Sequence, residues 1–239
     1  LRRLAIPWDV SQRPRPRQAR TDPVISTPRA PRERLVVALD FPGRRQALEM
    51  VERLRGEVGM FKVGKQLFTA EGPGLVREIL DAGQKVFLDL KFHDIPNTVA
   101  GAVASAVGLG ASLVNVHASG GGPMLRAAAT AAAGSQTRVL AVTVLTSLDA
   151  GHLDQVGFAE PPEKLVLRLA RLALECGLDG VVASPVEVAM LRAELGRAFL
   201  IVTPGIRPSG AELGDQVRVA TPAEAVRNGA DYIVVGRPI

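Results

Sequence analysis

The chain has 239 residues, of which 47% are hydrophobic and only 4% aromatic, and its formal net charge is +5 at pH 7. The mean hydropathy of +0.17 excludes a disordered or collagen-like chain and is typical of one large globular domain or two small ones. The charge suggests an anionic partner such as a nucleic acid, but residues 1–30 hold seven arginines against two aspartates, whereas the other 209 residues hold 22 basic and 22 acidic side chains.

The first 30 residues are rich in arginine and proline and show neither helical nor strand periodicity. Such a composition favours a flexible basic tail over a packed element. The same composition would be found in a nucleic-acid-binding arm, in an acid-poor transit peptide or in sequence upstream of a misplaced start. We expect a solvated tail without a catalytic role, and the lack of an initiating Met leaves the natural start undefined.

From Arg34 onward, short β-branched apolar runs alternate with longer amphipathic runs, which is typical of strand and helix units around a parallel sheet. The predicted strands cover 35–39, 59–63, 85–90, 113–116, 139–144, 180–183, 199–202 and 232–235, and the predicted helices cover 44–55, 74–82, 98–108, 123–133, 163–176, 185–195 and 222–228. This pattern predicts a single α/β domain over residues 31–239, a TIM (β/α)8 barrel. No G-x-G-x-x-G follows the first strand, which argues against a dinucleotide-binding open sheet.

The predicted barrel lacks its last helix, because the sequence stops at Ile239, just after the eighth strand. Either the given sequence is cut short or another element covers that side of the barrel. The N-terminal tail is one candidate for that element.

Cys176 is the single cysteine, which excludes a disulfide framework and a cysteine-based zinc cluster and favours a cytoplasmic location. Its place in an amphipathic helical pattern predicts a core residue. The three histidines lack zinc-site spacing, so no metal is expected. No segment reaches the ~18 consecutive apolar residues of a membrane span, so no membrane partner is expected either.

Catalytic residues of such barrels lie at the carboxyl ends of the strands. Polar side chains or glycine occupy nearly all of these ends: Asp40, Lys62, Asp89, Lys91, His117, Thr146, Arg207, Gly236 and Arg237. A buried structural role could explain one or two of them, but it does not easily explain all.

The densest group lies in DLKFHDIPNT, residues 89–98. Residues two apart on a strand share a face, so Asp89 and Lys91 are expected to face the barrel mouth while Leu90 packs outward. With Lys62 from the preceding strand, lysines and carboxylates would converge in one concave site, an arrangement that is costly to bury without a use. Each charge keeps its neighbours ionised, so a protonated Lys91 is expected to act as a general acid.

Beyond this pair, the same segment predicts a turn into the next helix. Pro96 ends the extended stretch, and Asn97 or Thr98 can cap the helix that follows. Asp94 is therefore expected on the connecting loop, from which it could fold back or reach a neighbouring molecule.

The sequence resembles the orotidine 5'-phosphate decarboxylase family in its bacterial form, from Arg34 to the end of the chain. The resemblance rests on VVALD at 36–40, KVG at 62–64, DLKFHDIPNT, VTVLTS at 142–147, PGIRPSG at 204–210, DQVR at 215–218 and IVVGRPI at 233–239. It implies decarboxylation of orotidine 5'-monophosphate (OMP) to UMP and CO2, the last step of de novo pyrimidine biosynthesis. Neither a metal nor a cofactor is implied, since an ammonium beside C6 can stabilise the carbanion that forms there.

The resemblance also implies a role for each matching residue. Lys91 would donate the proton to C6, Asp89 would lie against the substrate carboxylate, and Lys62 would hold the charge network. The remaining contacts would be made by Asp40 and Lys62 to the ribose, by Thr146 and Ser147 to the pyrimidine, and by Arg207, Gln216, Arg237 and the Gly236 amide to the phosphate. The PGIRPSG segment around Arg207 would act as a loop that closes over the nucleotide.

A homodimer is implied as well, because Asp94, with Ile95 and Thr98, would be supplied to the partner subunit's site. Two other functions stay open. One is a magnesium-dependent sugar-phosphate decarboxylase or aldolase of the same barrel superfamily, which shares D-x-K-x-x-D. In such an enzyme the second-strand position resembles a carboxylate that binds the metal, whereas this chain has Lys62 there, and a lysine would repel Mg²⁺. A nucleic-acid-binding protein acting through the basic tail would leave the barrel motifs unused, so no nucleic-acid partner is expected.

Overall fold

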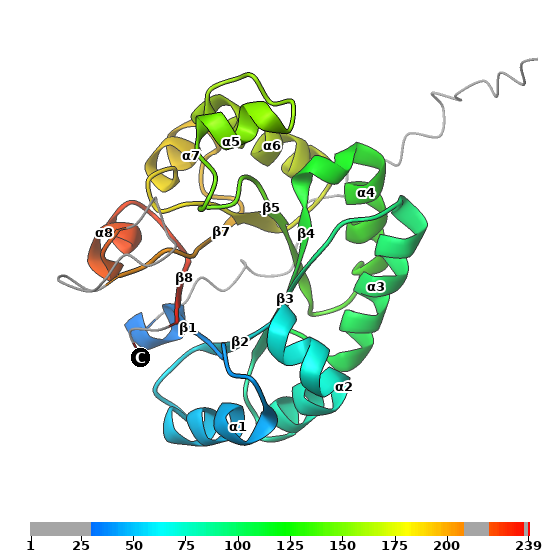
Figure 1. Cartoon of the computed structure of the whole chain (residues 1–239), viewed down its shortest axis with the longest axis vertical. Coiled ribbons are helices and arrows are strands. Elements are labelled where there is room, and N and C mark those ends of the chain that lie inside the picture. Colours follow the sequence, from blue (N-terminus) through cyan, green and yellow to red (C-terminus); the bar gives the residue numbers. More distant parts are fainter. Residues whose placement is uncertain (1–29, 208–219, 237–238) are drawn as a thin grey trace, which may run out of the picture.

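The computed structural model describes residues 30–207, 220–236 and 239. Within this part of the chain, parallel strands close into a barrel in the order β1 to β8 (Figure 1). The strands are β1 (Leu35–Ala38), β2 (Met60–Gly64), β3 (Val86–Phe92), β4 (Leu113–His117), β5 (Arg138–Val142), β6 (Gly180–Val182), β7 (Leu200–Thr203) and β8 (Tyr232–Val235). The closing pair sets Leu35 of β1 against Ile233 of β8. The predicted barrel is thereby confirmed.

Helices surround this barrel, as Figure 1 shows. They are α1 (Arg44–Arg53), α2 (Lys65–Asp81), α3 (Pro96–Leu109), α4 (Gly121–Ala131), α5 (Ala150–Gln155), α6 (Pro162–Glu175), α7 (Val188–Leu195) and α8 (Pro222–Arg227), with 3-10 turns η2 (Pro31–Arg34) and η3 (Ala118–Gly120). The short α5 was not predicted. It begins where the Asp149 carboxylate accepts a hydrogen bond from the His152 backbone at 2.9 Å, as an N-cap does.

Helix α2 contains the predicted segment 74–82, preceded by a further helical segment that starts at Lys65 and was not predicted. Gly72 has a left-handed φ of 63° and divides the element at a kink just before Pro73. Glycine adopts this φ without steric cost, and a proline is tolerated in the first turn that follows. The Gly-Pro pair therefore separates two helical segments, and the second of them begins where the predicted helix does.

Two apolar layers follow from the alternation of side chains along the strands. One set fills the barrel interior: Val36, Met60, Phe87, Leu113, Leu140, Val182, Leu200 and Val234. Intervening residues such as Val37, Phe61, Val114 and Ile201 face outward and pack against the helices in the larger core. Cys176 is buried in this outer layer, as expected.

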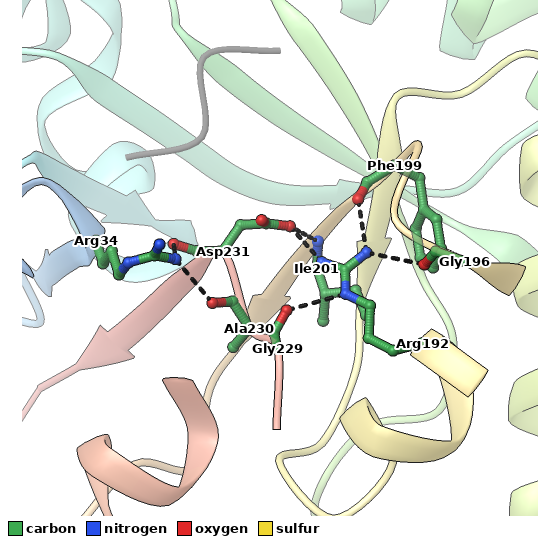
Figure 2. A network of polar contacts seen from close by, with 8 residues as sticks. All are labelled: Arg34, Arg192, Gly196, Phe199, Ile201, Gly229, Ala230 and Asp231. Carbon is green, nitrogen blue, oxygen red and sulfur yellow. Dashed lines mark hydrogen bonds and ion pairs between the residues drawn. The ribbon is translucent and has the colours of Figure 1, made fainter. Parts of the chain in front are cut away.

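An ionic clamp at the amino-terminal ends of β7 and β8 joins α7 to both strands (Figure 2). Arg192 of α7 donates to Asp231 Oδ2 at 2.6 Å, and the Ile201 backbone donates to the same oxygen at 2.7 Å. The Arg192 guanidinium also lies 4.8 Å from the centre of the Phe199 ring. Arg34, just before β1, donates to the Asp231 carbonyl at 3.4 Å, so the clamp reaches the seam where the barrel closes.

Several predictions fall outside the described residues. The basic tail does so except for Ala30, and after β8 only Gly236 and Ile239 are described, so the tail and the missing last helix stay predictions. Among the described helices, none combines the length and the apolar character needed to cross a membrane.

Candidate active site

A cavity of about 280 Å³ opens at the carboxyl ends of the strands. Its polar lining comes from six different strand ends or the loops that follow them: Asp40, Lys62, Asp89, Lys91, Thr146, Arg207 and Gly236. Residues far apart in the sequence therefore meet because every strand delivers its last residues to the same mouth. Seven of the predicted site residues are brought together here.

Four charged side chains form a row of alternating sign along one wall of this cavity. Lys62 Nζ lies 3.3 Å from Asp40 Oδ1 and 3.5 Å from Asp89 Oδ2. On the other side of Asp89, Lys91 Nζ lies 2.6 Å from Oδ1. The Lys62 and Asp89 side chains are each only 11% exposed, whereas those of Asp40 and Lys91 are 58% and 25% exposed, so the row is most buried at its centre.

Asp89 is nearly buried, and its pKa reflects a balance between burial and the groups that contact its carboxylate. Burial alone would raise this pKa, but the nearby charges of Lys91 and Lys62, together with hydrogen bonds from Lys91 and Asn115, lower it below the ordinary value. Asp89 is therefore a carboxylate at neutral pH. The cavity can thus present ammonium groups and a fixed negative charge to one bound molecule.

Lys91 reaches Asp89 through an irregular backbone. Its φ is 52°, which makes it the one described non-glycine residue with a positive φ, and the β3–β4 register shifts between Leu88 and Phe92. A bulge of this kind redirects a side chain at the end of a strand. The predicted meeting of Asp89 and Lys91 is correct, but the regular alternation used to predict it ends before Lys91.

Asn115 is a site residue that was not predicted. It lies in the middle of β4, fully buried, and its amide donates to Asp89 Oδ1 at 2.7 Å. Its carbonyl oxygen accepts the Lys91 backbone N–H at 2.8 Å. The signal available in the sequence is a single carboxamide among the apolar residues of LVNVH, where an apolar side chain would be expected.

Asp94, Ile95 and Thr98 do not line the cavity of their own chain. All three are exposed, and Asp94 Oδ1 accepts the Ile95 backbone N–H at 2.6 Å. The predicted cap at Asn97 or Thr98 is wrong, because α3 begins at Pro96 with Ile95 as its N-cap residue. Proline fits the first helical position, since its missing N–H has no partner there in any helix.

The residues expected at the base and the phosphate are placed in part. Thr146 is buried against the cavity, while Ser147 is exposed outside its lining. Arg207 lines the cavity, and its backbone N–H donates to the Ala220 carbonyl at 3.0 Å. A Cβ at Gly236 would lie 3.4 Å from Asp40 Oδ2, so Gly236 forms the part of the wall next to Asp40. Gln216, Arg237 and residues 208–210 of PGIRPSG lie outside the described residues.

Beside the cavity, the rings of His93 and His117 lie 5.5 Å apart. Burial, followed by the charge of His93, lowers the pKa of His117 to about 4, so its imidazole is neutral at pH 7. His117 ends β4 but does not line the cavity. In the described ranges, no three His, Cys, Asp or Glu side chains are grouped so that they could hold a metal ion.

A closed parallel barrel with a charged cavity at the carboxyl ends of its strands defines an enzyme of the (β/α)8-barrel class. Residues 33–239 match the Orotidine 5'-phosphate decarboxylase / HUMPS family. The chain belongs to this family.

Individual relatives agree with this assignment. The chain is 59% identical to an orotidine 5'-phosphate decarboxylase of Anaeromyxobacter dehalogenans over 209 residues, which cover 87% of this chain and 92% of the relative. It is 56% identical to that of Halorhodospira halophila over 217 residues, which cover 90% and 91%. The crystal structure of orotidine 5'-phosphate decarboxylase from Lactobacillus acidophilus superposes with a TM-score of 0.76 at 39% identity, covering 86% of this chain and 90% of that one.

Proposed function

We propose that this chain catalyses the decarboxylation of OMP to UMP and CO2, the last step of de novo pyrimidine biosynthesis, with Lys91 as the proton donor. Family membership and the relatives named orotidine 5'-phosphate decarboxylase support the reaction. The observation that carries the assignment of residues is the row Lys62, Asp89 and Lys91 inside the cavity, with Lys91 Nζ 2.6 Å from the Asp89 carboxylate.

Breaking the bond between C6 and the carboxylate leaves its electron pair on C6, in the plane of the pyrimidine, where the ring cannot delocalise it. A fixed ammonium beside C6 stabilises that charge electrostatically. Lys91 then transfers one proton to C6, which completes UMP, and CO2 departs as the neutral product. Lys91 is left as an amine that regains its proton from water.

Asp89 would lie next to the substrate carboxylate. Its negative charge opposes the carboxylate of OMP but not neutral CO2, so this contact favours the transition state over bound substrate. Lys62 balances the same carboxylate from the other side and, with Asp40, would bind the ribose hydroxyls. The charged row would therefore serve both the reacting carbon and the sugar.

The other contacts would bind parts of the nucleotide that do not react. Thr146 and Ser147 would contact the pyrimidine, and the phosphate would bind to Arg207, Gln216, Arg237 and the Gly236 amide. The binding energy of a phosphate remote from C6 can be used to close a loop and to fix the ring against Lys91. Arg207 and Gly236 lie on the cavity wall as this assignment requires.

A homodimer would complete the site in the cytoplasm. Asp94, Ile95 and Thr98 lie together on the surface at the start of α3, and the Ile95 side chain is an exposed large apolar group at 67%. An apolar side chain next to a carboxylate, both facing away from their own cavity, suits delivery to a second copy of this chain.

The magnesium-dependent alternative is disfavoured by one residue. Lys62 stands between Asp40 and Asp89, at 3.3 and 3.5 Å, where a divalent cation shared by these carboxylates would have to bind. An ammonium there repels a cation. We therefore propose that catalysis needs neither a metal nor a cofactor.

The deciding experiment follows the ultraviolet absorbance of OMP in the presence of EDTA. We expect conversion to UMP that is insensitive to EDTA and falls by about 10³-fold or more in Lys91→Ala. Lys164→Ala, on the exposed face of α6, is the matched control and should keep full activity. Full activity of Lys91→Ala would refute the proton donor, and loss of activity with EDTA would refute the metal-free reaction.

A further inference from the structure

We propose that Asn115 is a positioning residue of this active site, which holds Lys91 and Asp89 in the geometry that the reaction needs. The inference rests on the proposed roles of Lys91 and Asp89. It adds a residue of β4 that does not line the cavity.

The Asn115 side chain uses both of its functional ends on the catalytic pair. Its Nδ2 donates to Asp89 Oδ1 at 2.7 Å, and its Oδ1 accepts the Lys91 backbone N–H at 2.8 Å. The side chain is fully buried, so no water can replace either bond without a rearrangement of the barrel interior. Asp89 Oδ1 also accepts Lys91 Nζ at 2.6 Å, so the three residues form a closed ring of hydrogen bonds.

The backbone at Lys91 explains why such a residue is required. With a φ of 52°, Lys91 leaves the regular ladder, and pairing of β3 with β4 resumes only at Phe92 opposite Val116. A lysine is disfavoured at this φ, and its N–H no longer meets a backbone carbonyl of the next strand. The Asn115 carbonyl supplies that missing acceptor and fixes the backbone from which the Lys91 side chain extends.

A carboxamide is suited to this place because of the charges around it. The charged or titratable groups around Asp89 and Lys91 are Lys62 from β2, Asp40 after β1 and His117 at the end of β4, with His93 beside His117. An aspartate would accept from Lys91 but would oppose Asp89 with a second negative charge, and leucine would fill the space without either bond. Asparagine donates and accepts while adding no charge.

Loss of Asn115 should therefore affect the chemical step more than binding. A displacement of about 1 Å at a catalytic group can cost about 100-fold in rate. For Asn115→Leu we expect kcat to fall by at least about tenfold, while KM for OMP and Kd for UMP change by less than about threefold. The Lys91 amide should also exchange its hydrogen faster, because it loses its acceptor.

A pH profile separates this role from simple support of the fold. The Asn115 hydrogen bond is one of the interactions that lower the pKa of Asp89. In Asn115→Asp, whose side chain has nearly the same shape, the low-pH limb of kcat should shift to higher pH, since Asp89 loses a donor and faces a second carboxylate. This isosteric variant also serves if Asn115→Leu fails to fold.

Thr137→Val is the matched control. Thr137 is also buried, and its hydroxyl donates to the Ala111 carbonyl at 2.7 Å, just before β5 and away from the cavity. This variant should lose stability but keep kcat and its pH profile. Wild-type kcat and an unshifted low-pH limb in both Asn115 variants would overturn the inference. Such a result for the Asn115 variants leaves the proposed function standing if Lys91→Ala is inactive in the same assay. Full activity of Lys91→Ala would instead overturn the proposed role of Lys91, on which this inference rests.

Discussion

Lys91 Nζ and Asp89 Oδ1 lie 2.6 Å apart, although only one residue separates them in the chain and Lys91 has a φ of 52°. The ion pair is therefore formed within one strand end, and its geometry depends on an irregular backbone. Removing Asp89 takes from Lys91 the carboxylate that it contacts, whereas removing Lys91 leaves Asp89 with the more distant Lys62 and with Asn115, in a site that water reaches only in part.

Asp89→Asn should test the row of charges as a source of stability. Lys62 and Lys91 would lose the carboxylate that they share, so we expect the free energy of unfolding to fall by about 3 kcal/mol and kcat to fall by at least about 100-fold. Urea denaturation and the OMP assay measure the two effects. Asp154→Asn, on exposed α5, is the control. Unchanged stability in Asp89→Asn would contradict the expectation.

Mixing two inactive variants tests whether Asp94 acts across a subunit interface. In a hybrid dimer of Lys91→Ala and Asp94→Ala, one of the two sites would combine an intact Lys91 with the intact Asp94 of the other copy. Random exchange should restore about a quarter of the wild-type activity. Mass spectrometry confirms the exchange. Exchange without recovery of activity would mean that Asp94 is not shared.

Arg192→Met should weaken the ionic clamp while leaving the chemistry intact. The variant keeps a flexible apolar stem beside Phe199 but leaves the nearly buried Asp231 carboxylate without its cation. We expect a loss of about 3–5 kcal/mol in denaturant unfolding, with normal kcat at low temperature. Arg45→Met breaks the exposed pair with Glu49 and should cost less than about 0.5 kcal/mol. Equal losses in both variants would contradict this prediction.

His117 should make the protein less stable in mild acid. Burial, then His93, lowers its pKa from 6.5 to about 4, so between these values the unfolded chain binds a proton that the folded chain does not. Stability therefore rises with pH across this window. Discounted for partial exposure, the loss from pH 7 to about 4.5 should be on the order of 1 to 2 kcal/mol.

His117→Gln should remove much of that dependence, and His152→Gln, in an exposed position, should not. Unfolding curves at several pH values measure the difference. NMR gives an independent check, because the His117 ring resonances should not titrate above about pH 5. A midpoint near the ordinary value of histidine would refute the burial argument.

The fold could be predicted largely from the sequence, because β-branched runs and amphipathic runs alternate with little interruption. Each observed strand lies within two residues of its predicted bounds. The helical turns over 65–71 were not predicted, since the Gly72-Pro73 pair separates them from the predicted segment 74–82. The cap of α3 was misplaced because a proline can occupy the first helical turn.

The candidate site was predictable wherever a charged residue ends a strand, as Lys62 and Asp89 do. Asn115 could not be found in this way, because it lies in the middle of β4, and its contact with the Lys91 backbone depends on a bulge in β3. A bulge depends on the pairing of two strands, and no local pattern records it. Asp94 and Ile95 are exposed in the single chain, so a role for them in an active site requires a second copy of the chain.

The clamp at the closing seam also bears on how the chain folds. Arg34 and Ala230, which it joins at 3.2 Å, are 196 positions apart, and β1 finds one of its two strand partners only in β8. Contacts between such distant segments form late, after shorter loops have closed. While the chain emerges from the ribosome, we therefore expect one edge of β1 to stay open until residues 232–235 arrive, so that the barrel cannot close before β8 has been made.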